Sequence, residues 1–220
     1  MSIDELSGSE LGTKTYWDRS YNEEIANYKN HGDVGTIWFD EDSQFRVINW
    51  ILKQETISSD VSIIDMGCGN GMLLIELARE GFSNLLGVDY SENAIKLAKQ
   101  IAKDQELNIL YQSADLLNTK LCQQQLGTFS IVHDKGTYDA ISLCPENPKE
   151  KREAYLSTVN SLMNENSLFI LTSCNWTEDE LLISLADKFI KKCCIPTPTF
   201  KFGGKTGSVV TSMVFTKKII

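Results

Sequence analysis

The sequence predicts a doubly wound α/β fold: a mixed sheet covered by helices, with an antiparallel C-terminal hairpin and an N-terminal helical appendage. Three observations support it. From Val61 onward, short apolar runs alternate with amphipathic helical patterns, which is typical of a largely parallel sheet. The end of the chain holds two β-rich runs around a glycine-rich turn. Residues 13–56 instead repeat aromatic and apolar side chains at helical spacing.

The 220 residues are expected to form a single domain with three parts. Residues 1–12 are polar and are expected to be an unanchored tail. Residues 13–56 form the helical appendage, in which a helix stop at residues 30–33 separates two helices. The second of these follows the acidic cluster Asp40-Glu41-Asp42. Residues 57–220 form the core that binds the ligand.

The core elements are justified in order by local pattern. Ser91 is expected to cap one helix, and Thr177 with Glu180 has the spacing of a capping box. The expected helices are residues 72–80, a segment after Ser91, 150–163 and 177–188. The expected strands are residues 61–65, 84–89, 108–112, 129–133 and 167–173, and the runs 195–202 and 209–216 around Gly203-Gly204-Lys205-Thr206-Gly207 form the hairpin.

Composition excludes several classes of function. A formal net charge of −9 argues against a protein that binds nucleic acid by neutralising phosphates. The chain has no apolar run near the ~20 residues of a membrane helix, and its start lacks the pattern of a signal peptide. We therefore expect a cytoplasmic protein, with the nucleus as a further location and reduced cysteines. The six cysteines are scattered without a CxxC pair, so no metal site is expected.

The negative charge is concentrated near the N-terminus. Residues 1–60 carry 5 basic and 12 acidic side chains. Such a bias is consistent with a solvated helical face. A solvated face is the commoner meaning of such a bias, and the alternative is a surface that attracts a basic partner.

The strongest local motif runs from Asp65 to Gly71 (DMGCGNG), between the first strand and the first core helix. Gly67, Gly69 and Gly71 allow the backbone to turn tightly and to approach a ligand. A dinucleotide-binding loop has its third glycine three residues after the second, where this chain has Met72. The observed spacing fits S-adenosylmethionine better, because this cofactor has no phosphate. Asp65 is placed to orient its ammonium group, and Asn70 belongs to the same loop.

Two further acids follow the next strands. Asp89 ends the second strand and is placed to accept hydrogen bonds from both hydroxyls of a ribose, although a surface acid beside a helix is the alternative. Tyr90 either lies against the adenine or packs in the core. The segment Ala114-Asp115-Leu116 follows the third strand, where Asp115 is placed to accept a hydrogen bond from the adenine amino group.

These motifs, in this order, resemble the class I methyltransferases over about residues 60–220, which implies a Rossmann-like sheet of seven strands. Residues 133–140 (HDKGTYDA) resemble a signature of protein lysine methyltransferases. Within that group, several segments resemble the eukaryotic elongation factor 1-alpha lysine methyltransferase 2 family. They are residues 11–13 with Trp17 and Tyr21, residues 35–39, residues 173–177 and residues 198–204.

The resemblance implies a cytoplasmic monomer that transfers methyl groups from S-adenosylmethionine to a lysine of elongation factor 1-alpha and releases S-adenosylhomocysteine. It implies neither nucleic acid nor membrane as a partner. Two alternatives stay open. One is a small-molecule methyltransferase in which the appendage acts as a lid. The other is a nicotinamide-dependent oxidoreductase or an inactive adapter, against which the glycine spacing and the intact acids argue.

For this reaction the lysine, with a pKa of ~10.4, must lose a proton before it attacks. Asp134 ends the fourth strand beside the expected methyl position, so we expect it to contact cofactor and amine; its alternative is a turn-capping acid. Tyr138 is counted with Asp134 among the catalytic residues, and Tyr138 or Trp38 is expected to wall the substrate channel. Lys135 and Asn175 are placed beside it, with Lys135 in a structural ion pair. The spacing of Trp17 and Tyr21 favours a packed helix face over a substrate cage.

Overall fold

The computed structural model describes residues 4–202 and 205–219. A seven-stranded sheet lies at its centre, with the strand order β3-β2-β1-β4-β5-β9-β6, and β7 and β8 form a separate two-stranded sheet. The strands are β1 Ile63–Met66, β2 Leu85–Asp89, β3 Leu110–Ser113, β4 Phe129–Lys135, β5 Met163–Ser173, β6 Phe189–Ile195, β7 Thr199–Phe202, β8 Lys205–Ser208 and β9 Thr211–Lys217. The helices are α1 Lys14–His31, α2 Asp40–Leu52, α3 Met72–Arg79, α4 Glu92–Asp104, α5 Thr119–Leu126, α6 Thr137–Ser142, α7 Pro148–Ser161 and α8 Glu178–Leu185.

The first five strands are parallel, and β9 lies antiparallel between β5 and β6. This mixed sheet confirms the predicted fold class. The order along the chain reverses between β1 and β4, which lie side by side. Ligands of such sheets bind at the carboxyl ends of the strands near this point.

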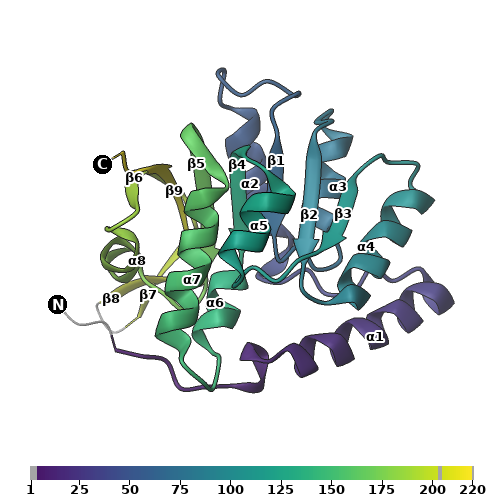
Figure 1. Ribbon diagram of the computed structural model, residues 1–220, viewed down its shortest axis with the longest axis horizontal. Coiled ribbons are helices and arrows are strands. Elements are labelled where there is room, and N and C mark those ends of the chain that lie inside the picture. The colour runs from purple at the N-terminus through teal and green to yellow at the C-terminus, as the bar shows by residue number, and fades with distance from the viewer. Residues whose placement is uncertain (1–3, 203–204, 220) are drawn as a thin grey trace.

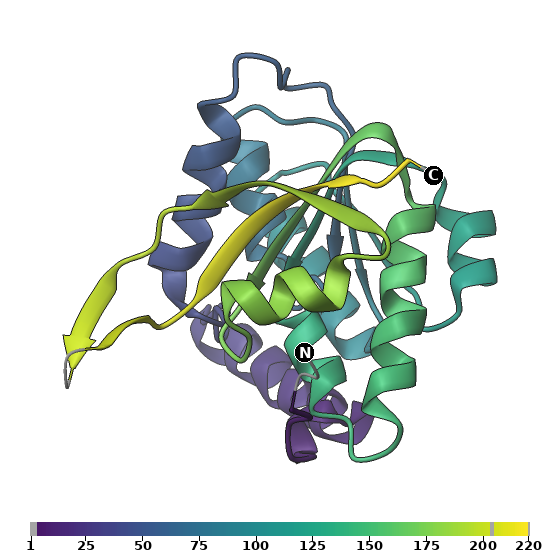
Figure 2. The ribbon, with the colours of Figure 1, turned by 90° about the vertical axis from the view of Figure 1, so that its left-hand side faces the viewer.

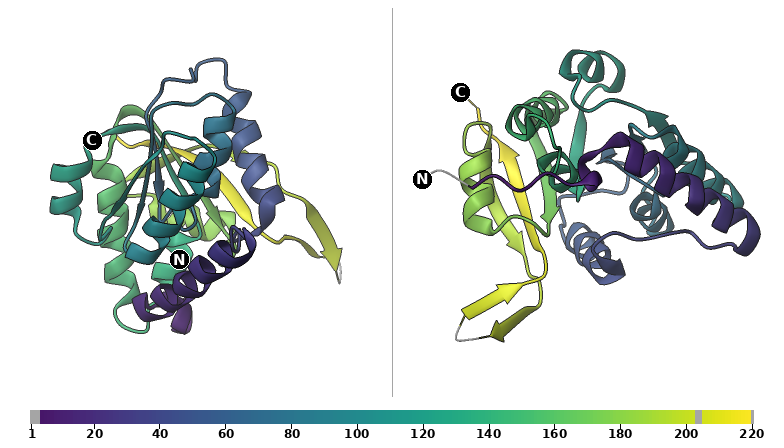
Figure 3. Two further views of the ribbon diagram at one scale, coloured as in Figure 1. Left: turned by 90° about the vertical axis from the view of Figure 1, so that its right-hand side faces the viewer. Right: turned by 90° about the horizontal axis from the view of Figure 1, so that it is seen from below.

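Helices cover both faces of the sheet (Figure 1). The buried side chains of α2, α3 and α4 pack on one face, and those of α5, α7 and α8 pack on the other. Helix α1 packs on α4 and crosses the lower edge of the sheet in Figure 1, where the parallel strands end. The right-hand view of Figure 3, from below, shows α1 lying in front of the sheet and its flanking helices. The appendage therefore covers the edge at which a ligand would bind.

The C-terminal part differs from the predicted hairpin. The run 195–202 is divided between β6, which begins earlier at Phe189, and β7. Pro196 and Pro198 stand between these strands and supply no backbone N–H for a ladder. The resulting β7–β8 hairpin projects away from the main sheet in Figure 2. The predicted turn at Gly203-Gly204 lies outside the described residues.

Two short helices, α5 and α6, were not among the expected elements. Asn118 caps α5 by accepting a hydrogen bond from the N–H of Leu121 at 3.2 Å. Ser91 does stand at the start of α4, but its side chain makes no capping bond. Its hydroxyl instead donates to Asp18 of α1 at 2.7 Å, which attaches the appendage to the core. The capping box of Thr177 and Glu180 forms as predicted.

The expectation of an unanchored tail is wrong for residues 4–12. Arg152 of α7 donates a hydrogen bond to Glu5 at 2.6 Å, and the N–H of Ser9 donates to the carbonyl oxygen of Leu143 at 2.9 Å. The thiol of Cys144 donates to the carbonyl oxygen of Gly12. This polar segment is held by hydrogen bonds to groups far along the chain, which its own composition does not reveal.

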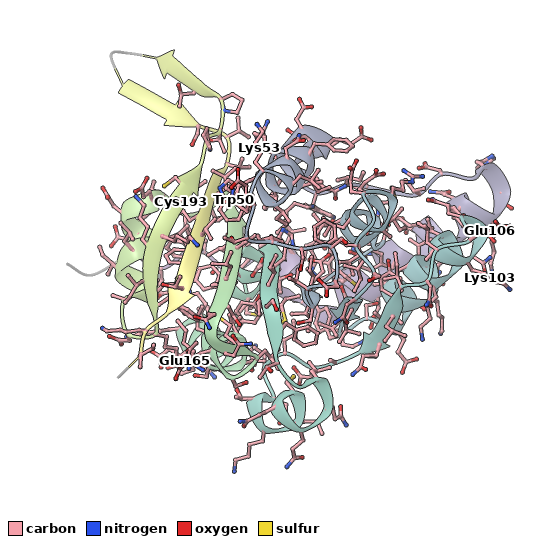
Figure 4. All side chains as sticks on the ribbon, turned by 90° about the horizontal axis from the view of Figure 1, so that it is seen from above. Trp50, Lys53, Lys103, Glu106, Glu165 and Cys193 are labelled. Atoms are coloured by element: carbon pink, nitrogen blue, oxygen red, sulfur yellow. The ribbon has the colours of Figure 1, made fainter. Side chains whose placement is uncertain are left out.

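Helix α2 completes the layer on its side of the sheet near β6. Figure 4 labels Trp50 of α2 and Cys193 of β6, and both side chains pack against the same core cluster. Among the helices that the structure describes, none combines the length and the apolar character needed to cross a lipid bilayer.

Candidate active site

A cavity of about 220 Å³ lies at the carboxyl ends of the parallel strands. The segments that follow β1, β2, β3, β4 and β5 all contribute to its lining. Helix α1 and the segment between α1 and α2 complete its walls. The cavity therefore brings the predicted cofactor motifs together with the appendage.

The glycine loop after β1 forms one wall. Gly67 and Gly69 line the cavity in the left-handed region, with φ of 75° and 55°. A Cβ on Gly67 would lie 2.0 Å from Oγ1 of Thr137, and one on Gly69 would lie 2.6 Å from the hydroxyl of Tyr21. Glycine is therefore required both for the turn and for the close approach of α6 and α1. Gly71 shares this conformation (φ 78°) but lies behind the cavity lining.

Asp89 lies at the end of β2, is 5% exposed and faces the cavity. Its carboxylate accepts the N–H of Gly69 at 3.1 Å and the N–H of Ser91 at 2.8 Å. Each carboxylate oxygen has a further acceptor position, so two ligand hydroxyls can still bind. Burial raises the pKa of Asp89 to about 6, although the two backbone hydrogen bonds oppose this shift. The carboxylate is therefore ionised at neutral pH.

Asp65 of β1 faces the cavity and is paired with His133 on the neighbouring strand β4. The distance from Oδ1 of Asp65 to Nδ1 of His133 is 2.7 Å, and both side chains are buried. The two residues are also register partners of the sheet. No role was predicted for His133, because a pairing across strands is not visible in a local pattern.

The segment after β3 closes the side next to Asp89. Asp115 is exposed, lines the cavity and accepts the N–H of Leu117 at 3.0 Å. Leu116, predicted with it, is buried against the cavity, and Tyr90 is a half-buried lining residue. Ala114 is not a lining residue; its N–H donates to the carbonyl oxygen of Asp89.

Residues 34–39 form a roof over the cavity. The side-chain amide of Asn70 donates to the carbonyl oxygens of Val34 and Thr36, at 3.0 and 3.3 Å. Nζ of Lys135 donates to the carbonyl oxygen of Trp38. Its partner is therefore a backbone carbonyl rather than the predicted ion pair, and burial lowers the pKa of Lys135. Asn70 and Lys135 thus hold the roof in place by hydrogen bonds to its carbonyl oxygens.

Aromatic side chains of the roof and of α1 line the cavity. The ring centroids of Trp17 and Trp38 lie 5.0 Å apart, and Trp17 stacks with Tyr21 at 6.0 Å. All three residues line the cavity. Trp38 therefore lies where the sequence placed it. The interpretation of Trp17 and Tyr21 as a helix face that only packs is incomplete, because the same rings also form the cavity wall.

The structure places Asp134 and Tyr138 away from the cavity. Asp134 is fully buried and accepts the N–H groups of Thr137 and Tyr138 and the hydroxyl of Tyr155, at 2.9, 3.0 and 2.5 Å. Burial raises its pKa to about 7. Tyr138 is 1% exposed and packs between Tyr155 and Trp176.

The predicted contact of Asp134 with the amine is therefore wrong in this geometry, and the turn-capping alternative describes what it does. The catalytic and wall positions given to Tyr138 are wrong as well. The reason is the alternation of side chains along a strand. His133 is bonded to Asp65 and Lys135 to Trp38, so both point to one side of β4, whereas Asp134 between them points to the other side and is bonded to Tyr155 of α7.

Asp139 is the lining carboxylate that the sequence analysis missed. It lies on α6, one residue after Tyr138, and is 4% exposed. Its oxygens accept the hydroxyl of Ser173 at 2.5 Å and the N–H of Cys174 at 2.7 Å. Asn175, predicted at the channel, lines the cavity beside them. Successive residues of an α-helix are rotated by about 100°, so a helix that turns Tyr138 away from the cavity can turn Asp139 toward it.

The cavity therefore combines a glycine loop, a buried acid suited to a diol and a set of aromatic rings. Among the described lining residues Lys135 is the one Lys or Arg, so these residues form no basic cradle for phosphates. Among the described residues, no three His, Cys, Asp or Glu side chains come together as a metal-binding group.

Comparisons with known proteins agree with this geometry. Residues 57–210 match the family model described as a methyltransferase domain. The EEF1A lysine methyltransferase 2 of Danio rerio is 46% identical over 96% of this chain and 90% of its own length. The protein-lysine N-methyltransferase EFM4 of Saccharomyces cerevisiae is 37% identical over 97% of both chains. A magnesium protoporphyrin IX methyltransferase from Synechocystis, solved with bound SAH, has the same fold, with a TM-score of 0.65, 18% identity and coverage of 94% and 100%.

Proposed function

Because this chain belongs to the EEF1A lysine methyltransferase 2 family, we propose that it methylates a lysine side chain of eukaryotic elongation factor 1A. The methyl donor is S-adenosylmethionine. The observation that carries the proposal is the similarity, over nearly the full length of the chain, to relatives named for this activity, together with a cavity lined by Asp65, Gly67, Gly69, Asn70, Asp89 and Asp115 of the cofactor motifs.

The residues of the cavity fit this cofactor. The buried carboxylate of Asp89 has acceptor positions left for the two ribose hydroxyls, and Asp115 lies next to it at the end of β3. Gly67 and Gly69 leave room for a ligand close to the backbone, and Asp65 supplies a carboxylate for an ammonium group. When bound, S-adenosylmethionine supplies a methyl group on a positively charged sulfur that leaves as a neutral thioether.

The aromatic side chains of the cavity suit the apolar stem of a lysine. Trp38, held next to Lys135 at the end of β4, and Trp17, which packs edge-on against it, provide apolar faces along which the methylenes of a lysine side chain can pack. Aromatic faces also attract a cationic amine. Burial there disfavours the charged ammonium and promotes the loss of its proton. We further propose that the protein acts as a monomer in the cytoplasm.

A small-molecule methyltransferase remains the alternative, and the roof at residues 34–39 would suit it as a lid. One experiment separates the two. The protein is incubated with tritiated S-adenosylmethionine and purified elongation factor 1A, and in parallel with a lysate depleted of that factor. Label in the factor, located on a lysine by mass spectrometry, supports the proposal. Label confined to small molecules would overturn it.

A further inference from the structure

Four carboxylates of described residues line the cavity, and their positions follow the order of the strands. Asp115 follows β3, Asp89 ends β2 and Asp65 lies in β1. The fourth, Asp139, is bonded to Ser173 and Cys174 at the end of β5. Since β4 and β5 lie beyond β1 in the sheet, Asp139 is at the far end of the row from Asp115.

Neighbouring strands are about 4.8 Å apart, so four steps from β3 to β5 span roughly 19 Å. The adenosine and amino acid parts of the cofactor account for the first three carboxylates. Asp139 is the one left for the acceptor, beside Asn175 and away from the ribose acid. This step rests on the proposed function.

The carboxylate of Asp139 is held in place by hydrogen bonds that use only part of its acceptor capacity. It is 4% exposed, and one oxygen is held by a hydroxyl and the other by a backbone N–H. Each oxygen retains one acceptor position. A carboxylate that is fixed by its neighbours can act on a charge that develops next to it without reorganising.

We propose that Asp139 is the carboxylate that faces the acceptor amine and stabilises the positive charge that its nitrogen gains. The ammonium first loses a proton to solvent. The nitrogen lone pair then forms a bond to the methyl carbon while the carbon–sulfur bond breaks, and that electron pair stays on sulfur. The nitrogen becomes cationic in this step, so a facing carboxylate favours the transition state over the neutral amine.

Burial also raises the pKa of Asp139. Hydrogen bonds from Ser173 and Cys174 oppose this effect and favour the ionised form. Lys135, the one Lys or Arg among the described residues that line the cavity, is engaged with the carbonyl oxygen of Trp38 in the roof.

The first part of the test compares the binding of two ligands that differ in charge at the methyl position, so it needs no turnover. Sinefungin carries an amine where S-adenosylmethionine carries its methyl sulfonium, whereas S-adenosylhomocysteine carries a neutral thioether. Calorimetry gives the ratio of the two affinities. Asp139→Asn should lower sinefungin affinity about tenfold and leave S-adenosylhomocysteine affinity within twofold. It should also lower kcat about 100-fold at a KM for elongation factor 1A within threefold.

Asp134→Asn is the matched control, since Asp134 lies in the same motif but caps α6 behind the cavity. It should leave the affinity ratio unchanged. Ser173→Ala tests a merely structural role, because it removes a support of Asp139 but keeps the carboxylate. It should retain most of the preference for sinefungin. An unchanged ratio in Asp139→Asn, or an equal loss in Ser173→Ala, would overturn the inference.

If Asp139→Asn does not fold, ligand binding by the unaltered protein still tests the inference. It should bind sinefungin at least as tightly as S-adenosylhomocysteine at pH 7.5, and a tenfold weaker binding would contradict an anionic group at that position. Failure of both ligands to bind would count against the proposed function. Binding of both with no role for Asp139 would count against this inference alone.

Discussion

Nζ of Lys135 donates a hydrogen bond to the carbonyl oxygen of Trp38 at 2.7 Å. This bond joins the end of β4 to the roof of the cavity. Phe39 and Asp40, directly after Trp38, both have left-handed backbone conformations, with φ of 63° and 70°. Such conformations are costly for residues other than glycine and persist only where neighbouring contacts hold them.

Replacing Lys135 should therefore loosen the roof. In Lys135→Met, we expect the Kd for S-adenosylhomocysteine to rise about tenfold, because a hydrogen bond from a charged donor contributes about 1.5–3 kcal/mol. Calorimetry measures this. Lys96→Met is the control, since its ammonium is exposed and 4.0 Å from Glu92. Equal affinities in the two variants would show that the roof does not depend on Lys135.

A matched pair of glycines tests the loop. A Cβ on Gly67 would collide with Thr137, whereas a Cβ on Gly81 would meet nothing within 4 Å, although both glycines are left-handed. Gly81→Ala should cost only about 1 kcal/mol of unfolding free energy. Gly67→Ala should cost more and should weaken cofactor binding at least tenfold. Denaturant titration and calorimetry measure the two effects, and similar cofactor affinities in the two variants would refute the assignment.

Cofactor binding should weaken in acid because of Asp89. The pKa of this carboxyl is about 6, so lowering the pH from 7.5 to 5 protonates it and removes an acceptor for the ribose. With about nine tenths protonated at pH 5, the Kd for S-adenosylhomocysteine should rise roughly tenfold. Asp89→Asn should bind weakly at both pH values with a flatter profile. A variant that keeps normal affinity, or the full pH dependence, would exclude the ribose contact.

Asp134 should affect stability with the opposite sign of pH dependence from a salt-bridged acid. Its folded pKa of about 7 lies above the ordinary value of 3.8, so the folded state binds the proton more tightly. The stability of the fold should therefore fall as the pH rises from about 4 to 7 and then level off. The difference in Tm between the unaltered protein and Asp134→Asn should shrink by several degrees between pH 5 and pH 8. A constant difference would mean that Asp134 does not titrate in this range.

The acidic start of α2 should guide a basic protein substrate. Asp40, Glu41 and Asp42 are exposed directly after the roof. Neutralising all three should raise the KM for elongation factor 1A about fivefold at low ionic strength, and less at 0.5 M salt, because salt screens exposed charges. Glu165→Gln, on the exposed first part of β5 (Figure 4), is the control. An equal KM in both variants would show that the acidic residues form a solvated surface and do not guide the substrate.

Local patterns predicted most of the sheet and the cofactor loops. The strands and the glycine loop were readable because burial and tight turning depend on adjacent residues, as at Asp65 to Gly71. Asp134 was placed at the cavity and Asp139 was given no role, because the positions of both side chains depend on the phase of β4 and on the six-residue helix α6. The pairing of Asp65 with His133 depends on the register between two strands, which no local spacing encodes.

The anchoring of residues 4–12 has a consequence for how the protein is made. Leu11 lines the cavity, yet the partners of its neighbours, from Leu143 to Arg152, leave the ribosome more than 130 residues later. During synthesis the first segment stays undocked, because closing so long a loop is slow and the contacts that would stabilise the closed state do not yet exist. The described lining of the cavity extends to Asn175, so the ability to retain a ligand arises only after at least that much of the chain has emerged. Ligand binding would thus report that the N-terminal segment has docked on the core.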